Sequence, residues 1–404
     1  MEKIKGKYLL TILAMCGLSA AAVGMHANTA GVFFTPVADS LGVGRGNVSL
    51  TLTISNLLFA TIGLLVPRVY SAQRFKRNLT VFGLLYAVTT ALHAAAPNLA
   101  VLYLLSALRG LSGGLAGNVV VTIVINNWFI SNVGLISSIA LGCSGICGAV
   151  FSPLLAAVIS RAGWRTGYLA AGIIILILEL PAMLLPITYI PEASGLMPLG
   201  GSSSSRAGHR AEEGRKSPIP PALFIPALAF AFIGSCATSF PQHFPGIADS
   251  FGRSAAVGSV MVSVCLLCNT GGKLVFGALA DRFGTKISAI IYIAVIAVGF
   301  LLVLLPGNGN TALFAGAAMI GLSYSLPTVG IVMLTNDIFG VENYARIFPK
   351  LSLCGTVAYA LGSALIGFAY DARKSYVPAL ITGLAMILMG VVITVWLYRR
   401  KGRN

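Results

Sequence analysis

The segment Pro36-Val-Ala-Asp-Ser-Leu-Gly42 occurs a second time in the chain, as Pro245-Gly-Ile-Ala-Asp-Ser-Phe-Gly252. A second pair keeps nearly the same spacing, since Ser55-Asn56 is echoed by Cys268-Asn269. Self-similarity at a fixed offset is the sequence signature of an internal structural repeat. The chain of 404 residues is therefore predicted to consist of two related halves.

Long apolar stretches surround both copies of the repeat, and about 20 apolar residues suffice to cross a bilayer as a helix. Such stretches lie at residues 8–36, 47–67, 78–96, 99–125, 133–159, 165–190, 221–246, 254–279, 285–305, 311–335, 346–370 and 376–398. The first stretch follows three lysines and resembles a secretory signal peptide, but the even count favours an uncleaved helix. The sequence predicts an all-α membrane protein of twelve transmembrane helices in two pseudo-symmetric six-helix halves.

The composition agrees with lipid as the main solvent. Hydrophobic residues make up 57% of the chain, charged residues only 9%, and the mean hydropathy is +0.89. A soluble domain carries about 25% charged residues. A chain this poor in charge is unable to cover a water-facing surface, so a large soluble domain is excluded.

The net charge of +16 is concentrated in short basic clusters at the ends of apolar stretches. With both termini in the cytoplasm, six of the 27 Lys and Arg residues fall in external loops and three inside spans. This bias predicts a multi-pass protein of the cell (plasma or inner) membrane with cytoplasmic N and C termini. No basic cluster is interleaved with aromatic residues, so nucleic-acid binding is not expected.

One long polar interruption divides the chain. Residues 192–219 contain a serine run, four basic residues and prolines, a composition typical of a flexible linker. We predict an N-terminal half at 1–191, a cytoplasmic linker at 192–219 and a C-terminal half at 220–404. The seven cysteines all lie in apolar runs, and their odd number argues against a disulfide framework. No cofactor or metal site is expected.

The segment Gly277-Ala-Leu-Ala-Asp-Arg-Phe-Gly-Thr-Lys286 resembles the loop signature of the major facilitator superfamily. Arg109-Gly110 with Gly113 in the fourth stretch is similar to another motif of that family. The resemblance implies two six-helix halves that rock around a central substrate. It also implies that Asp281 and Arg282 act in gating, through charge pairs at helix ends. In the first half, Pro67 stands where the family has the acidic residue.

Other motifs resemble the oxalate/formate antiporter and monocarboxylate transporter branch of the superfamily. They are Trp128-Phe129, the glycines at 142, 145 and 148 with Pro153, and Gly163-Trp164-Arg165. The basic pair that often follows Trp-Phe in this branch is replaced here by Ser131-Asn132. The resemblance implies a carboxylate substrate bound by a cation in the eighth helix, where this chain has Lys273 instead of the usual arginine. A snorkelling lysine is the structural alternative.

Further polar residues inside the spans are candidates for the site. Lys350 is a second cation that could hold a dicarboxylate, or it is a charge at a helix end. Arg109 is interpreted as a coupling residue or as a partner of backbone carbonyls, and Glu179 as a proton carrier or a peripheral acid. The uncharged candidates are either substrate ligands or interhelical hydrogen-bonding groups; they are His26, Asn28, Asn56 and Asn269.

Three buried cations against one buried acid favour an anionic cargo. We expect a secondary active transporter, monomeric in the lipid bilayer, that moves a small organic anion (a mono- or dicarboxylate) as an antiporter or a proton symporter. Efflux of an amphipathic cation or drug is the alternative, and a non-transporting membrane receptor is a remote one. An enzyme is not expected, because the four scattered histidines form no catalytic pair.

Overall fold

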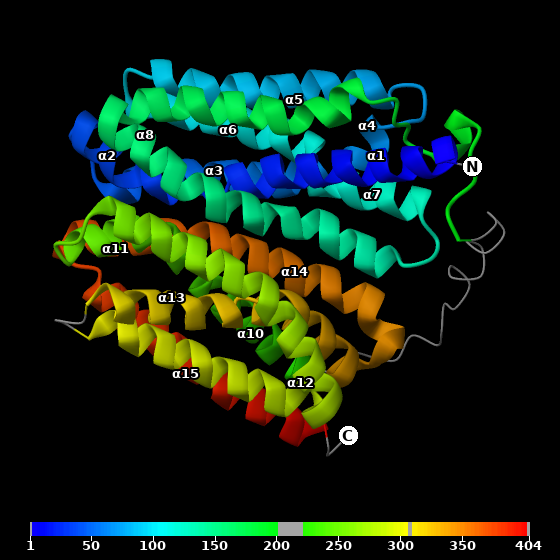
Figure 1. Cartoon of the computed structure of the whole chain (residues 1–404). Helices are drawn as coiled ribbons and strands as arrows, with labels where there is room; N and C mark the ends of the chain where they lie inside the picture. The colour runs from blue at the N-terminus through cyan, green and yellow to red at the C-terminus, as the bar shows by residue number, and fades with distance from the viewer. Residues whose placement is uncertain (1, 201–220, 306–308, 402–404) are drawn as a thin grey trace. The chain divides into compact units, whose positions relative to one another are not determined.

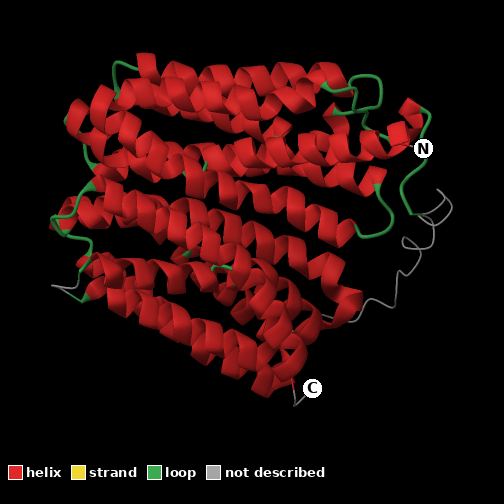
Figure 2. Ribbon diagram, viewed as in Figure 1, coloured by secondary structure: helices red, strands yellow, loops and turns green. Residues whose placement is uncertain are grey.

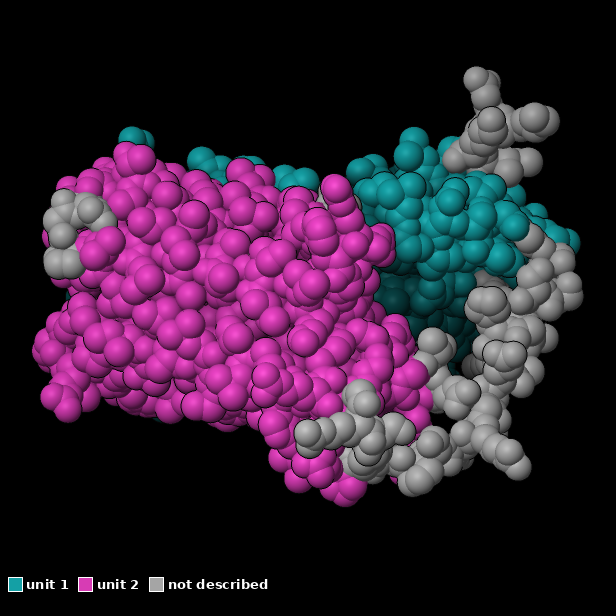
Figure 3. Space-filling model, turned by 90° about the horizontal axis from the view of Figure 1, so that it is seen from below, with its two compact units in different colours: residues 1–41, 54–212 teal, residues 42–53, 213–404 magenta. Residues whose placement is uncertain are grey.

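The computed structural model describes residues 2–200, 221–305 and 309–401. Helices are the regular elements throughout these ranges (Figure 2), apart from an isolated bridge between Phe129 and Leu199. The chain forms two compact units (Figure 3). Unit 1 contains residues 1–41 and 54–212, and unit 2 contains residues 42–53 and 213–404.

Unit 1 is built around the long helix α8, which packs against α1 and α5 (Figure 1). Its elements are α1 (Glu2–Ser19), η1 (Ala20–Met25), α2 (Gly31–Leu41), α3 (Arg45–Gly63), α4 (Val66–Val69), α5 (Phe75–Leu92), η2 (His93–Ala95), α6 (Leu99–Ala116), α7 (Asn118–Trp128), α8 (Val133–Leu184) and η3 (Pro191–Ser194). Helix α3 is shared, because its first residues, up to Thr53, group with unit 2.

In unit 2, α12 packs against α13 and α15, and α10 packs against α14 (Figure 1). The elements are α10 (Pro221–Ala237), η4 (Phe240–His243), α11 (Phe244–Ser250), α12 (Ala255–Leu304), α13 (Asn310–Ser323), η5 (Leu326–Gly330), α14 (Ile331–Arg373) and α15 (Val377–Lys401).

The described helices provide twelve membrane crossings. Nine spans are long and apolar enough by themselves, and one of them, Val133–Leu184, holds two helices joined at Gly163. The same kind of junction divides α12 at Gly284 and α14 at Gly340. The two parts of α12 and the second part of α14 are already among the nine spans. Helix α3 and the segment from α13 through Gly340 complete the set. The predicted fold, an all-α bundle of two six-helix halves, is confirmed.

The sequence repeat corresponds to a structural repeat, because the first crossing of each half is broken. In unit 1 a turn at residues 26–30 separates η1 from α2, and in unit 2 Thr238 and Ser239 separate α10 from η4. Both crossings end at the repeated glycine, Gly42 or Gly252, which has a positive φ of 64° or 70°. A left-handed residue that closes a helix favours glycine, since a Cβ there would be strained.

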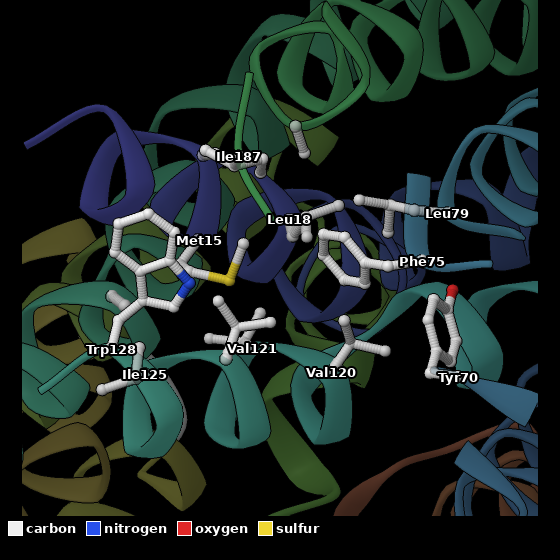
Figure 4. Packing of buried hydrophobic residues seen from close by; sticks show 14 of the residues in the cluster. Met15, Leu18, Tyr70, Phe75, Leu79, Val120, Val121, Ile125, Trp128 and Ile187 are labelled. Carbon is white, nitrogen blue, oxygen red and sulfur yellow. The ribbon is translucent and has the colours of Figure 1, made fainter. Parts of the chain in front are cut away.

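An apolar core of unit 1 joins its first crossing to the segment that follows its last crossing. Met15 lies beside Trp128 and Leu18 lies beside Phe75 (Figure 4), and Ile187 belongs to the same cluster. Trp128 Nε1 donates to the carbonyl of Thr188 at 2.8 Å, and Leu199 N donates to the carbonyl of Trp128 at 2.9 Å. Residues 185–199 are therefore held on unit 1, and residues 201–219 of the predicted linker lie outside the described ranges.

Candidate functional site

A cavity of about 400 Å³ lies inside unit 2, between α10, the α13–η5 junction and α14. Its wall combines hydroxyl groups with apolar side chains; the residues are Ser235, Thr238, Tyr324, Ile331, Phe348, Leu351, Ser352, Gly355, Thr356 and Tyr359. We call this cavity the hydroxyl pocket. A volume of roughly 300–1,000 Å³ is typical of sites for small molecules. The lining residues carry no formal charge.

Helix interruptions open the hydroxyl pocket. Ser235 and Thr238 lie where α10 ends, and Tyr324 lies in the turn between α13 and the π-helix η5. Irregular backbone at membrane depth is tolerated where it is buried in protein or lines a cavity. Broken helices near the membrane midplane commonly form the substrate sites of secondary transporters. Gly355 adds space on the third side, because a Cβ there would lie 2.6 Å from Ser235 Oγ.

The hydroxyl groups of the pocket form a connected network. Gln242 Nε2 donates to the Tyr359 hydroxyl at 3.0 Å, and the Tyr324 hydroxyl interacts with both Tyr359 and Thr238. Thr238 Oγ1 in turn donates to the carbonyl of Ser235 at 2.6 Å. Since a hydroxyl both donates and accepts, this wall can bind a hydroxyl or carbonyl group of a ligand. It has no cation with which to neutralise a carboxylate.

The predicted cations of the C-terminal half lie elsewhere in unit 2. Lys273 is half-buried on α12, and its ammonium has no hydrogen-bond or ion-pair partner within the described part of the chain. Asn269 lies one turn earlier on the same face, and its buried Oδ1 has no donor among the described residues. Lys350 is exposed and lies over the ring of Phe224, with Nζ 5.6 Å from the centroid. None of the three lines the hydroxyl pocket.

Arg109 lies in unit 1 at the break of the first crossing. Its Nη2 donates to the carbonyls of Met25 and His26, at 3.2 and 3.3 Å. These carbonyls lie where η1 gives way to the turn. The Met25 carbonyl also accepts from Thr29 Oγ1 at 2.9 Å, and the guanidinium supplies a donor to the His26 carbonyl. Arg109 also interacts with the hydroxyl of Tyr86, which donates to the carbonyl of Ala21 at 3.1 Å. The partners of its side chain are thus backbone carbonyls and a hydroxyl.

The uncharged candidates of the N-terminal half surround this break. His26 is buried, its Nε2 lies 3.1 Å from Ser55 Oγ, and its ring also interacts with Asn56. The amide nitrogen of Asn56 has no acceptor among the described residues. Asn28 Nδ2 donates to the carbonyl of Ser144 in α8 at 3.0 Å. His26 and Asn56 therefore lie together near Arg109, whereas Asn28 ties the turn to α8.

Glu179 is packed between two helices of unit 1. Its side chain is 1% exposed, and Oε2 has no partner among the described residues. Space for the carboxyl group comes from Gly83 of α5, where a Cβ would lie 2.8 Å from Oε2. No cation pairs with this acid in the described ranges, and it is absent from the pocket wall.

The junction between the two helices of α12 lies in the segment that resembles the loop signature, and its residues 281–284 are exposed. Neither Asp281 nor Arg282 forms an ion pair within the described chain, and Arg282 lies over the ring of Phe283 at 5.3 Å. The ion pair near this end of unit 2 involves other residues. Asp337 accepts from Lys401 Nζ at 2.7 Å and from the Tyr398 hydroxyl at 2.5 Å.

Sequence reasoning missed the hydroxyl pocket. Its polar residues lie in apolar runs, where Ser and Thr usually bond to their own helix, as Thr356 does with Ser352. The sequence feature that could have indicated the pocket is a hydroxyl residue close to a proline in an apolar run, such as Tyr324 three residues before Pro327.

Sequence reasoning also missed a charged cluster at the start of α3. Arg45 Nη2 pairs with Asp249 at 2.6 Å, and the guanidinium lies 4.3 Å from the centroid of the Tyr370 ring. Asp371 accepts from the backbone N–H groups of Arg45 and Gly46, at 2.8 and 2.7 Å. Asp249 is the repeated acid of the second half, so the repeat itself was the available signal.

The second half of the chain matches a known family directly, because residues 223–404 match the family model of the Major Facilitator Superfamily. This match covers slightly less than half of the chain, so the C-terminal half is similar to that superfamily. No curated protein matches it at a significant level. The branch that handles oxalate, formate or monocarboxylates therefore remains a prediction.

Two solved structures have the same fold over nearly the whole length. One is a bacterial homolog of the human lysosomal transporter Spinster, with a TM-score of 0.70, 14% sequence identity, and coverage of 99% of this chain and 97% of that one. The other is the nucleoside transporter NupG, with a TM-score of 0.70, 14% identity, and coverage of 96% and 99%. At this identity the likeness concerns the fold alone.

Proposed function

We propose that the chain is a transporter of the Major Facilitator Superfamily, and that it moves a small organic anion by alternating access between its two halves, as an antiporter or a proton symporter. The site of action is the plasma or inner membrane, with both termini in the cytoplasm. Support for a transporter comes from residues 223–404, which match the family model of the Major Facilitator Superfamily.

The observation that carries the proposal is the ammonium of Lys273, which has no partner among the described residues. A charged side chain at the centre of a membrane costs on the order of 2.5–3.5 kcal/mol on insertion scales. The guanidinium of Arg109 recovers part of that cost from the carbonyls of Met25 and His26. Lys273 has no such partner within the described ranges, so a bound carboxylate would supply the missing counter-charge.

The alternative cargo, an amphipathic cation, needs an acid that faces the substrate. Glu179 is the candidate from the sequence, but it is packed against Gly83 between α5 and α8 and is 1% exposed. This packing favours the anion over the cation.

The membrane potential restricts how such an anion can move. Moving one negative charge inward against an inside-negative potential costs about 2.3 kcal/mol per 100 mV. Uptake therefore needs a proton that travels with the anion or an internal anion that leaves in exchange.

The test is uptake of labelled oxalate, formate, lactate and pyruvate into proteoliposomes, with either a proton gradient or a trapped internal anion. We expect saturable uptake that is lost in Lys273→Gln and kept in Lys374→Gln, an exposed lysine in an external loop of the predicted topology. Uptake that does not depend on Lys273 would refute the assignment of the anion site.

A further inference from the structure

The hydroxyl pocket offers its ligand a chemistry that differs from that of Lys273. Its lining residues provide six hydroxyl groups, at positions 235, 238, 324, 352, 356 and 359, and no charge. Such a wall can complement hydroxyl or carbonyl groups through hydrogen bonds. A carboxylate placed there would lose its hydration shell without gaining a counter-charge, which is unfavourable.

We infer that the hydroxyl pocket is the subsite for an uncharged, hydroxyl-bearing part of the substrate, and that the cargo is a polyhydroxylated carboxylate. The carboxylate end of this assignment rests on the proposed function, since Lys273 would bind it. The hydroxylated end rests on the pocket, independently of any cation.

The arrangement of the network supports specific recognition of hydroxyl groups. The Tyr359 hydroxyl is held by Gln242 Nε2 at 3.0 Å, and the backbone carbonyl of Tyr359 accepts from Ser239 Oγ at 2.8 Å. Both partners come from the break between α10 and α11, so side chain and backbone are fixed from the same side. A donor fixed before the ligand arrives loses little conformational entropy on binding, and this increases affinity.

The apolar residues of the pocket determine how the ligand is oriented. Phe348 lines the cavity, and its ring stacks on Tyr344 with the centroids 4.9 Å apart and the planes 11° apart. Leu351 and Ile331 extend this apolar surface. A carbon chain or ring with hydroxyl groups on one side therefore fits, because its C–H face can pack on Phe348 while its hydroxyls face the tyrosines.

Binding to purified full-length protein tests the inference with three matched probes. Gluconate carries both a carboxylate and hydroxyl groups, hexanoate carries only the carboxylate, and glucitol carries only hydroxyl groups. We expect gluconate to bind at least about tenfold more tightly than hexanoate, which corresponds to one or two additional hydrogen bonds. Tyr359→Phe and Tyr324→Phe each remove one hydroxyl and keep the ring, so each should reduce this ratio several-fold.

The control is Tyr398→Phe, which makes the same chemical change in unit 2 at a residue that does not line the pocket. It should keep the ratio of the wild type. The inference is overturned if hexanoate binds as tightly as gluconate, if neither hydroxylated probe binds, or if both pocket variants keep the ratio unchanged.

Failure of the proposed function gives a different result. Glucitol would then bind as tightly as gluconate, and Lys273→Gln would change neither affinity, while the loss of hydroxyl selectivity in Tyr359→Phe would persist. These results together would show that the hydroxyl pocket binds a ligand and that this ligand needs no carboxylate.

Discussion

Asp371 caps the first turn of α3, and replacing it with asparagine tests how much that cap contributes. Its two carboxylate oxygens accept from the backbone N–H groups of Arg45 and Gly46, at 2.8 and 2.7 Å. These are among the first N–H groups of the helix, which have no partner within it. The negative charge also lies at the positive end of the helix dipole, where it is stabilising.

The magnitude follows from what asparagine is unable to replace. Asp371→Asn keeps one oxygen, and its amide nitrogen is a donor that faces another donor, so one backbone N–H loses its acceptor. Leaving such a group unsatisfied costs about 1–3 kcal/mol. Because about 1.4 kcal/mol is a factor of ten in an equilibrium, amide exchange in residues 42–53 should become roughly 5- to 150-fold faster.

Hydrogen–deuterium exchange of the peptide that covers residues 42–53 is the assay, with Asp249→Asn as the matched control. In this cluster Asp249 contacts the side chain of Arg45 and not the backbone N–H groups of α3, and Asp249→Asn keeps an oxygen that can accept from Nη2. It should therefore change exchange in this peptide less than Asp371→Asn does.

The effect of Asp371→Asn should persist in an Arg45→Gln background, because the bonds of Asp371 go to the backbone and not to the guanidinium. Disappearance of the effect in that background would show that Asp371 acts by ion pairing, and would refute the capping interpretation.

Three further outcomes are expected. Gly355→Ala should weaken binding of hydroxylated probes about tenfold with the fold intact, since the new Cβ would lie 2.6 Å from Ser235 Oγ; unchanged binding would contradict the placement of the pocket. Trp128→Phe should destabilise unit 1 by about 1 kcal/mol in thermal unfolding, because the indole loses its bond to the Thr188 carbonyl; an unchanged melting temperature would argue against that role. Glu179→Gln should retain transport at every pH tested, because no partner among the described residues contacts Oε2; loss of transport would indicate a proton carrier.

The architecture could be predicted from the sequence because hydropathy and the repeat are properties of single segments. Twelve apolar stretches and the duplicated segment ending at Gly42 and Gly252 determine the number of crossings and the two halves. The hydroxyl pocket could not be predicted in this way. Tyr324 and Tyr359 are far apart in sequence, and they meet because α13 and α10 are interrupted at particular residues. The hydropathy of a span does not indicate where its helix is interrupted, since the residues at the interruption are mostly apolar.

The sequence also identified Lys273 and Arg109 without showing how they differ. Both are single cations in apolar runs, so composition treats them alike. In the structure Arg109 donates to backbone carbonyls, whereas Lys273 has no partner in the described ranges. A substrate role therefore fits Lys273 better than Arg109.

Substitution of Arg109 can separate its charge from its hydrogen bonds. Arg109→Gln removes the buried charge and keeps one amide donor for the carbonyls of Met25 or His26, whereas Arg109→Leu removes charge and donors together. The Met25 carbonyl still accepts from Thr29 Oγ1 at 2.9 Å, so the cost in the leucine variant falls on the His26 carbonyl. A carbonyl left without a donor in the interior costs about 1–3 kcal/mol, so the leucine variant should melt at a lower temperature than the glutamine variant. If the charge itself were the stabilising feature, the two variants would be equally unstable. If the desolvation cost of the buried guanidinium exceeded the gain from its hydrogen bonds, both variants would be at least as stable as the wild type. The break in the first crossing exposes these carbonyls, so the difference between the two variants measures how far Arg109 completes an interrupted helix.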